Sequence, residues 1–358
     1  MRNFVNLGEY TRIRTGKLDA NASSPNGKYP FFTCSQEPLR IKSYSYDCEC
    51  VLVAGNGDLN VKYYNGKFDA YQRTYIIESL DKDKLLPRYM FYFLELYIET
   101  LRKESIGGVI KYIKLGNLTN AKIFLPDLAT QQKIIDILDK SVAAIARRKK
   151  QLASCDMLVK SQFIEMFEGE KYPDCPIKEL VTGRVESVRK RYKPEDRIRY
   201  VDISSIDNKL NQMTGYTEYS LQEAPSRAQQ CIEKGDILVS TVRPNLRNIA
   251  MNTFDDDHMV ASSGFCVLRA TTCNRSYLLA ALLLDKFSRK MSELTIGANY
   301  PAIKDSDVLG YRIPRPPIER QNEFARFVEQ TDKSKFRIKQ SLEKLETLYK
   351  ALLQKYFG

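Results

Sequence analysis

Apolar residues alternate at spacings of four and three near the C-terminal end of the chain. The pattern is carried by Ile338, Leu342, Leu345, Tyr349, Leu352 and Tyr356. It predicts a long helix that pairs with another helix through one apolar face. An earlier stretch has an apolar residue at every seventh position, namely Leu138, Ile145, Leu152, Val159 and Met166. Because one narrow seam cannot form a globular core, we expect the two helices to pair with each other.

These two stretches are copies of each other at a constant offset of 190 positions, as from Gln131 to Gln321. The same offset relates Pro126 to Pro316, Leu152 to Leu342 and Phe167 to Phe357, and it reaches back to Ile113 and Ile303. A long internal repeat predicts a duplicated architecture. The alternative is two unrelated core helices, each buried locally, and the common offset argues against it.

A mixed α/β segment precedes each long helix. In the first half, strands are predicted over residues 29–33, 50–54, 61–64 and 70–78, with turns at Gly55-Asn-Gly57 and Asn65-Gly66 and a helix over 85–101. In the second half, strands are predicted over residues 200–205 and 235–240 and a helix over 276–294. The fold class is therefore mixed α/β (α+β), with two pseudo-repeated globular domains joined by two long coiled-coil helices. The expected bounds are 1–125 and 169–315 for the globular domains, and 126–168 and 316–358 for the spacer helices.

The charge balance indicates a polyanionic partner. The chain has 56 Lys and Arg against 44 Asp and Glu, a net charge of +12. Nucleic acid is the first expectation and a membrane surface the second. No apolar run is long enough to span a membrane, and the N-terminus lacks the apolar core of a secretory signal. Eight Cys without a C-x-x-C pair favour free thiols in a reducing cytoplasm.

Motifs for catalysis are missing from the sequence. It contains no phosphate-binding G-x-x-x-x-G-K-[ST] loop, no dinucleotide fingerprint, no N-P-P-[YF] methyltransferase box and no E-x-K nuclease pair. His258 is the only histidine, which excludes a Ser-His-Asp triad and two-histidine metal sites. The Asp255–His258 segment reads as an exposed acidic turn more readily than as a cation site. We therefore expect a chain without an enzymatic activity or metal of its own.

The repeated helix starts, P-D-L-A-T-Q-Q-K-I-I-D-I-L-D at residues 126–139 and P-P-I-E-R-Q at 316–321, together with the two globular segments, resemble the specificity subunit of type I restriction–modification enzymes. The resemblance covers essentially the whole chain. It implies two target-recognition domains that each read one half of a split duplex DNA sequence, with the two long helices packed antiparallel as a spacer. Arg320 and Asn322 make the second copy of the motif less regular than Gln131-Gln132, which bears on docking at that end.

The same resemblance implies the partners. Two modification subunits would dock on the chain to methylate adenine, and restriction subunits can join them. S-adenosylmethionine, ATP and Mg would then sit on partner subunits, and this chain would bind no cofactor.

Loop residues that can hydrogen-bond base edges are the candidates for reading DNA, because Arg suits guanine and Asn or Gln suits adenine. The base-reading candidates are Asn56, Asn60, Lys62, Gln72 and Arg73 in the first half, and Arg243, Asn245, Arg247, Asn248, Ser262 and Ser263 in the second. The phosphate-binding candidates are Arg189, Lys190, Arg191 and Lys193. The plain alternative for each is a solvated loop residue or, for the base readers, a phosphate contact.

Two other functions stay open at this point. One is a coiled-coil scaffold whose globular domains bind proteins and whose basic charge is incidental. The other is an RNA-binding accessory protein. Salt-sensitive binding to a split duplex sequence would separate DNA recognition from both.

Overall fold

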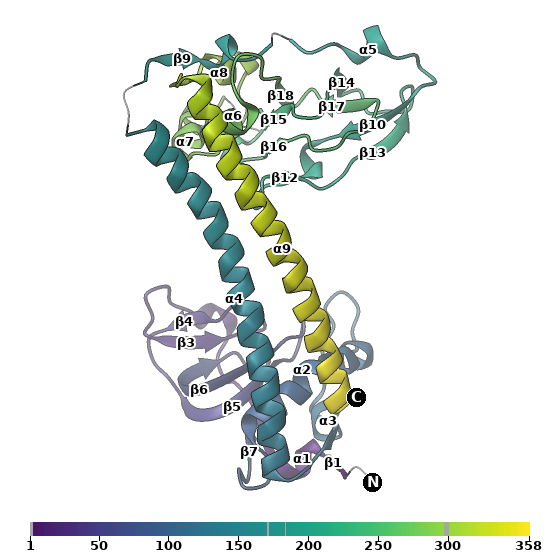
Figure 1. The fold of residues 1–358 in the computed structure, drawn as a ribbon. Helices are drawn as coiled ribbons and strands as arrows, with labels where there is room; N and C mark the ends of the chain where they lie inside the picture. Colours follow the sequence, from purple (N-terminus) through teal and green to yellow (C-terminus); the bar gives the residue numbers. More distant parts are fainter. Residues whose placement is uncertain (1–2, 170–171, 183, 297–300) are drawn as a thin grey trace. The chain divides into compact units, whose positions relative to one another are not determined.

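The computed structural model describes residues 3–169, 172–182, 184–296 and 301–358. The chain forms two compact units: the first is Met1–Lys150 with Lys339–Gly358, and the second is Gln151–Ile338. Two long helices, α4 (Leu128–Phe167) and α9 (Ile318–Phe357), each contribute to both units and have 40 residues each (Figure 1). Their bounds differ by the offset of the sequence repeat, so the predicted pair of long helices is confirmed.

The first unit is built on a six-stranded sheet with the order β2-β7-β5-β6-β3-β4. Its strands are β2 (Thr11–Thr15), β3 (Tyr29–Phe32), β4 (Leu39–Ile41), β5 (Tyr46–Ala54), β6 (Val61–Ala70) and β7 (Thr74–Ser79). Successive residues of β5 point to opposite faces of the sheet, as strand geometry requires. One face buries Leu52 with Phe32, Phe68 and Ile76. The other face buries Val51 and Val53 against helix α2 (Pro87–Glu104), the helix predicted over 85–101.

Two local predictions for this sheet are wrong. Asn65-Gly66 was expected to form a turn, but both residues lie inside β6 and pair with Glu49 and Cys48 of β5. The long β5–β6 ladder overrides the local Asn-Gly preference, and Gly66 adopts a φ of 134° that a glycine tolerates. The strand predicted over 70–78 is instead interrupted by a turn at residues 71–73, after which β7 begins at Thr74.

Five short elements complete the described part of the first unit, and the last two of them lead into α4. They are β1 (Phe4–Asn6), α1 (Leu7–Tyr10), η1 (Ala20–Ala22), α3 (Leu115–Thr119) and β8 (Lys122–Phe124). β8 pairs antiparallel with β1 and leads directly into the long helix. The start of α4, through Ile135 and Leu138, shares a core with Leu353 and Phe357 at the end of α9. Within the first unit the two long helices are therefore antiparallel.

The second unit has a five-stranded sheet, β11-β12-β16-β15-β18, and a four-stranded sheet, β13-β10-β17-β14. Their strands are β10 (Arg197–Val201), β11 (Ile206–Asp207), β12 (Gln212–Met213), β13 (Thr217–Ser220), β14 (Ala228–Cys231), β15 (Ile237–Ser240), β16 (Ile249–Met251), β17 (Met259–Ser262) and β18 (Phe265–Leu268). The other elements are β9 (Asp174–Pro176), η2 (Ile177–Glu179), α5 (Val188–Arg191), η3 (Ile203–Ser205), η4 (Pro244–Leu246), α8 (Asp305–Gly310) and β19 (Arg312–Pro314). The strand predicted over 200–205 ends at Val201, because the Asp202 side chain caps the short helix η3.

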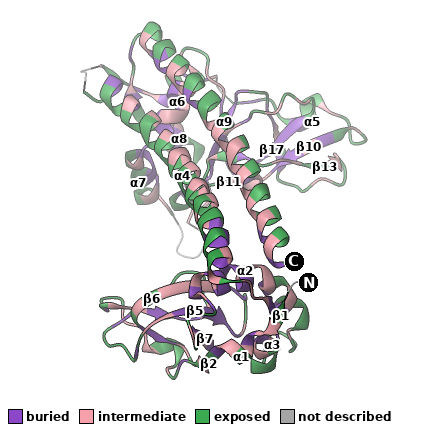
Figure 2. Cartoon of the chain, turned by 60° about the horizontal axis from the view of Figure 1, so that its bottom comes forward, coloured by how far each residue is buried: buried purple, intermediate pink, exposed green. Residues whose placement is uncertain are grey.

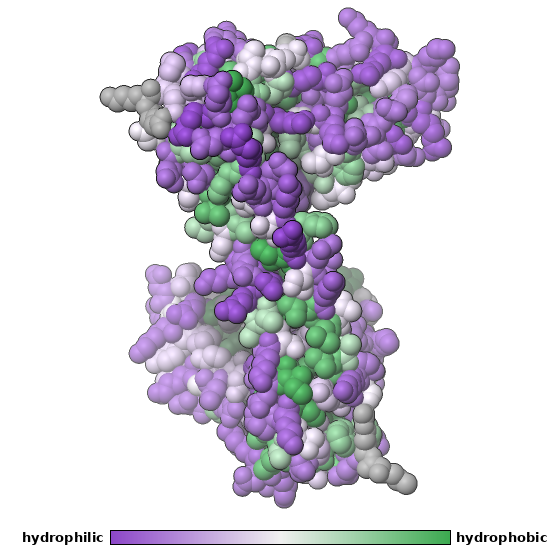
Figure 3. Space-filling model, viewed as in Figure 1, coloured by the Kyte–Doolittle hydropathy of each residue, from purple (hydrophilic) through white to green (hydrophobic). Residues whose placement is uncertain are grey.

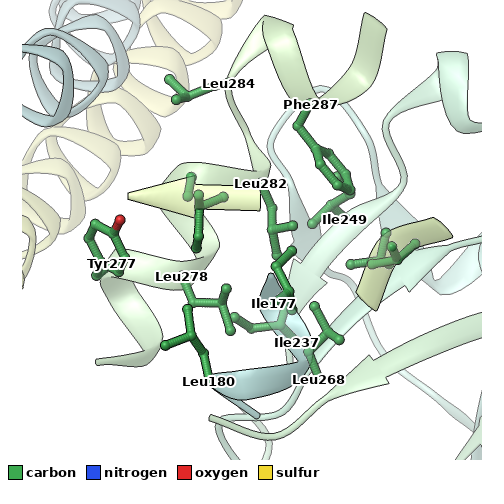
Figure 4. Packing of buried hydrophobic residues seen from close by; sticks show 14 of the residues in the cluster. Ile177, Leu180, Ile237, Ile249, Leu268, Tyr277, Leu278, Leu282, Leu284 and Phe287 are labelled. Atoms are coloured by element: carbon green, nitrogen blue, oxygen red, sulfur yellow. The ribbon is translucent and has the colours of Figure 1, made fainter. Parts of the chain in front are cut away.

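The helix predicted over 276–294 is two helices, α6 (Arg275–Leu282) and α7 (Asp285–Glu293). The break lies at Leu284, whose backbone is extended with φ −68° and ψ 145°. This break lets Leu284 and Phe287 bury their side chains in the same core as Leu278 and Leu282 (Figure 4). Local helical spacing predicts the two pieces but not the change of direction between them.

The long helices are antiparallel within the second unit as well. Phe324, near the start of α9, packs on Phe163 and Phe167, near the end of α4, with ring centroids 5.5 and 5.6 Å apart. Lys335 pairs with Asp156 at 2.5 Å. No residue of α4 between Leu138 and Phe163 is fully buried, although the structure describes all of them (Figure 2). None of the helices in the described part of the chain is long and apolar enough to cross a membrane.

Hydrogen bonds show that the repeat extends through both units. Gln131 is fully buried, and its Oε1 accepts from Leu86 N while its Nε2 donates to Pro126 O. Gln321 repeats this arrangement with Asn274 N and Pro316 O.

A second pair of bonds repeats between the units, from tyrosines 188 positions apart on the short helices to carbonyls 190 positions apart. The Tyr89 hydroxyl donates to Phe124 O, and the Tyr277 hydroxyl donates to Pro314 O. Helix α6 therefore occupies in the second unit the place that α2 occupies in the first.

Candidate nucleic-acid interface

Three loops of the first unit meet beyond the end of β5. Gly55, directly after β5, donates its N–H to the carbonyl of Arg73 in the β6–β7 turn at 2.8 Å and accepts from Ile113 N at 3.0 Å. The loops enclose a hollow of about 220 Å³. It is lined by Thr15, Gly55, Gln72, Arg73, Tyr75 and Ile113. Two of the five base-reading candidates of this half, Gln72 and Arg73, thus face one polar hollow.

Of the other three candidates of the first half, Asn56 and Asn60 lie in the β5–β6 loop and Lys62 lies at the start of β6. Asn60 is only 7% exposed, and its Nδ2 donates to the carbonyls of Cys34 and Asp58 at 2.8 and 2.9 Å. It therefore holds the loop in shape. Lys62 is half-buried and donates to Asn60 Oδ1, and burial lowers the pKa of its ammonium group. Asn56 is half-buried and pairs with Tyr112 in a single β-bridge.

The corresponding loop of the second unit runs from Thr241 to Asn248. Arg243 and Arg247 both have positive φ, 48° and 56°, on either side of the short helix η4. Such values cost energy in residues other than glycine and require a fixed surrounding. Arg247 bonds Asp285 at 2.6 Å, and the hydrogen bonds from Lys160 and Arg247 hold the pKa of Asp285 below its usual value.

The two loops occupy equivalent places in the repeat. Gly57 N donates to Lys111 O at 2.9 Å, and Arg243 N donates to Pro301 O at 2.8 Å. Gly57 also has a positive φ of 69°. The second unit thus places an arginine side chain at the position where the first unit has a glycine.

The remaining candidates of the second half differ in exposure. Asn245 and Ser263 are exposed. Asn248 and Ser262 are only 6% and 3% exposed, and Ser262 Oγ accepts from Gly264 N at 3.2 Å. These two buried side chains shape the loops and present little surface to a ligand.

The expected phosphate-binding residues lie on and just after helix α5. Arg189, Lys190, Arg191 and Lys193 are all exposed. The guanidinium group of Arg191 lies 3.6 Å from the carboxylate of Glu233. The segment therefore offers a compact group of exposed cations. Figure 3 shows that hydrophilic residues dominate the visible face of the second unit around it.

Two positioning residues were missed by the sequence reasoning. Asn208 and Asn211, between β11 and β12, donate their side-chain amides to the carbonyls of Leu246 and Arg247 at 2.9 and 3.0 Å. They brace the arginine-bearing loop from the side. The only available signal was a polar N-K-L-N segment, which does not indicate which loop it would contact.

The residues expected to pair the helices are all buried or half-buried on α4 and α9. They are Leu138, Ile145, Leu152, Val159, Ile338, Leu342, Leu345, Tyr349 and Leu352.

Within residues 3–169, 172–182, 184–296 and 301–358, no cluster of three or more His, Cys, Asp or Glu could hold a metal ion. The chemistry offered at these loops is hydrogen bonding and positive charge.

Comparison with known proteins finds one family and several full-length relatives. The family described as type I restriction modification DNA specificity domain matches residues 3–154 and again residues 179–347. The type I restriction enzyme EcoDI specificity subunit of Escherichia coli is 26% identical, with 99% of this chain and 87% of that protein aligned. The MjaVIII specificity subunit of Methanocaldococcus jannaschii is 22% identical, over 92% of this chain and 85% of that protein.

Solved structures show the same fold. The crystal structure of the type I restriction-modification system S subunit from M. genitalium has a TM-score of 0.61 at 16% identity, covering 100% of this chain and 96% of that one. A structure from a study of complex assembly and conformational transition of the type I R-M system has a TM-score of 0.57 at 17% identity, covering 99% and 97%.

Proposed function

The chain belongs to the type I restriction modification DNA specificity family, and from this premise we propose that its two loop clusters read the two halves of a split duplex DNA target. It is a DNA specificity subunit of a type I system, a non-catalytic component of that complex. The first cluster consists of residues 55–60 and 71–73. The second consists of residues 241–248 with Ser263.

The observation that carries this proposal is the equivalence of the two clusters. Each lies beyond the end of the same central strand, β5 in one unit and β15 in the other, and each is anchored by equivalent backbone bonds from Ile113 to Gly55 and from Ile303 to Thr241. The frames are alike, while the exposed side chains differ, with Gln72 and Arg73 against Arg243 and Asn245. Like frames with unlike polar loops suit two readers of different sequences.

We further propose the domain division 1–125, 126–168, 169–315 and 316–358, with the helices as the spacer between readers. Two modification subunits would dock on the chain, with restriction subunits joining them. Apolar side chains exposed on α4 and α9 support docking, notably Met157 at 70% and Phe336 at 62% exposure. S-adenosylmethionine, ATP and Mg would sit on those partners, and the assembly would act in the cytoplasm, where its DNA lies.

The test is a map of methylated adenines in cells that carry this chain and its neighbouring subunits, with and without the chain. The proposal expects one split motif with a constant gap to lose methylation when the chain is removed. If the neighbouring methyltransferase is active and no motif is lost, the chain is a scaffold and not a reader.

A further inference from the structure

A large cavity, open to solvent, lies in the second unit, and one of its lining residues, Asn211, also bonds the carbonyl of Arg247 in the second reading loop. Its volume is about 550 Å³, and its walls come from α4, α9, α6, β16 and the β11–β12 hairpin. This volume falls in the range of small-molecule sites, roughly 300–1,000 Å³. The first unit shows what normally fills this position of the repeat.

In the first unit the equivalent space is filled by aromatic rings and a guanidinium group. Arg88 lies over the rings of Tyr63 and Tyr92, 4.8 and 5.2 Å from their centroids, and bonds Asp139 at 2.8 Å. The Tyr92 ring lies 6.5 Å from that of Tyr349. The Tyr349 hydroxyl donates to the carboxylate of Glu95 at 2.5 Å, which closes the group.

The repeat assigns a counterpart to each of these residues on the short helix and the long helix. Because Leu86 and Asn274 bond the equivalent glutamines, α6 follows α2 with a constant offset of 188 positions. This matches Arg88 to Ser276, Tyr92 to Ala280 and Glu95 to Leu283. The offset of 190 on the long helices matches Tyr349 to Val159.

The sheet supplies one more counterpart. Tyr63 pairs with Val51 in the β5–β6 ladder, and Met251 pairs with Ile237 in the β15–β16 ladder. Since Gly55 and Thr241 occupy equivalent places, Val51 matches Ile237 and Tyr63 matches Met251. Five of the six counterparts, Val159, Met251, Ser276, Ala280 and Leu283, line the cavity; Glu329, which matches Asp139 at the offset of 190, is exposed and does not. The cavity is therefore the space that smaller or apolar residues leave where the first unit has a packed aromatic group.

We propose that this cavity is a binding site for a neutral aromatic small molecule, which takes the place of the rings that fill the first unit. The walls combine apolar residues, Phe163, Leu279 and Met213 among them, with polar and charged ones, and methionine adapts to the outline of a ligand. Thr253, which is exposed, adds a polar group for a hydrogen-bonding edge.

The charges around the cavity favour a neutral ligand. Lys335 is paired with Asp156 at 2.5 Å, and Lys160 with Asp285 at 2.6 Å. A third lysine of the lining, Lys209, is exposed on the β11–β12 hairpin, so a charged group placed among Phe163, Leu279 and Met213 would leave water without a counter-ion beside it, which is costly. A bound ring would touch α4 and α9 on one side and β16 on the other, and so would tie the helices to the sheet within this unit.

Indole is a suitable probe because it is aromatic, neutral and has one N–H donor. Saturation-transfer NMR on the full chain, followed by a titration, should show one saturable site. Ala280→Tyr restores the residue of the first unit and should weaken binding by about tenfold or more. Val159→Tyr fills the cavity from the opposite wall and should do the same. Ala153→Tyr, at an exposed position of α4, is the matched control and should bind like the parent chain.

The outcomes are distinct from those of the methylation map. Indole that gives no saturation transfer with the parent chain, or that binds both filled variants as it binds the control, overturns the proposal. Far-UV circular dichroism establishes that each variant is folded, and with two filling variants one can fail to fold without loss of the test. Tryptamine, a cation at neutral pH, and indole-3-acetate, an anion, should both bind more weakly than indole if the site takes neutral rings. If either charged compound binds more tightly than indole, the site does not select neutral ligands.

Discussion

Replacing Gln131 by alanine tests the clamp that fixes the start of α4. Gln131 is fully buried, and its amide group bonds Leu86 N, Lys84 O and Pro126 O at 2.9, 2.7 and 2.9 Å. The substitution leaves these three backbone groups without their partner. A buried polar group left unpaired costs about 1–3 kcal/mol, and carbonyls cost less than N–H groups because they have two lone pairs. We therefore expect a loss of about 3 kcal/mol in the free energy of unfolding.

The repeat supplies a graded comparison. Gln321→Ala removes the bonds to Asn274 N and Pro316 O, both at 2.8 Å, and should cost about 2 kcal/mol. Gln132→Ala is the control, because Gln132 is exposed and bonds only the exposed Asp136. It should change stability by less than about 0.5 kcal/mol.

Urea unfolding gives the free energies, and hydrogen exchange locates the effects. Gln131→Ala should speed exchange in the segment around Leu86, and Gln321→Ala in the segment around Asn274. If Gln131→Ala costs no more than Gln132→Ala, or if exchange around Leu86 is unchanged, the clamp does not hold the helix start and the reasoning is wrong.

Three further predictions concern the reading loops. Arg243→Ala should relax the methylated motif at one base position, and an unchanged motif would show that Arg243 does not read a base. Lys190→Ala should instead weaken binding to every DNA sequence alike. It should also reduce the slope of log affinity against log salt concentration by about 0.9, as expected for the loss of one phosphate contact. Arg243→Gly should raise stability by about 1 kcal/mol in urea unfolding, because φ is 48° there, and equal stability would argue against strain. Lys62→Met should stabilise the chain at neutral pH, because burial lowers the folded-state pKa of Lys62. Between that lowered pKa and the ordinary value of 10.5, the unfolded parent chain binds more protons than the folded one, so the free energy of unfolding of the parent rises with pH. The stability difference between Lys62→Met and the parent should therefore shrink as pH rises through this range. A difference that stays constant up to about pH 11 would contradict this.

The long helices could be predicted because their signals are local and repeated. The heptad spacing from Ile338 to Tyr356 and the offset from Gln131 to Gln321 need no knowledge of tertiary contacts. The β-sheet details could not be predicted in the same way. Asn65-Gly66 has the composition of a turn, and only the distant partner strand β5 keeps it extended. The break at Leu284 likewise depends on a core that forms from segments far away in the sequence.

The loops that carry the candidate residues could be predicted from the sequence, but the burial of each side chain could not. Asn60 and Asn248 have the chemistry of base readers, yet both are buried, with Asn60 bonding neighbouring carbonyls. Asn208 and Asn211 were not singled out, yet they hold the loop that carries Arg247. Asn serves both roles with the same amide group, so composition alone cannot separate a residue that shapes a loop from one that faces a ligand.

The positions at which the two halves agree and disagree follow from what each residue contacts. Gln131 and Gln321 agree because each bonds backbone atoms at a helix start, and those atoms are present in both halves whatever the surrounding sequence. Gly57 and Arg243 differ in residue type although both have a positive φ. The backbone φ is similar at the two positions, while both positions are exposed and the side chain there can therefore vary. The same reasoning applies to Tyr92 and Ala280, whose backbones are equivalent while one side chain fills a space that the other leaves open. A duplicated chain can therefore change what it reads or binds at such positions without disturbing the bonds that define its two units.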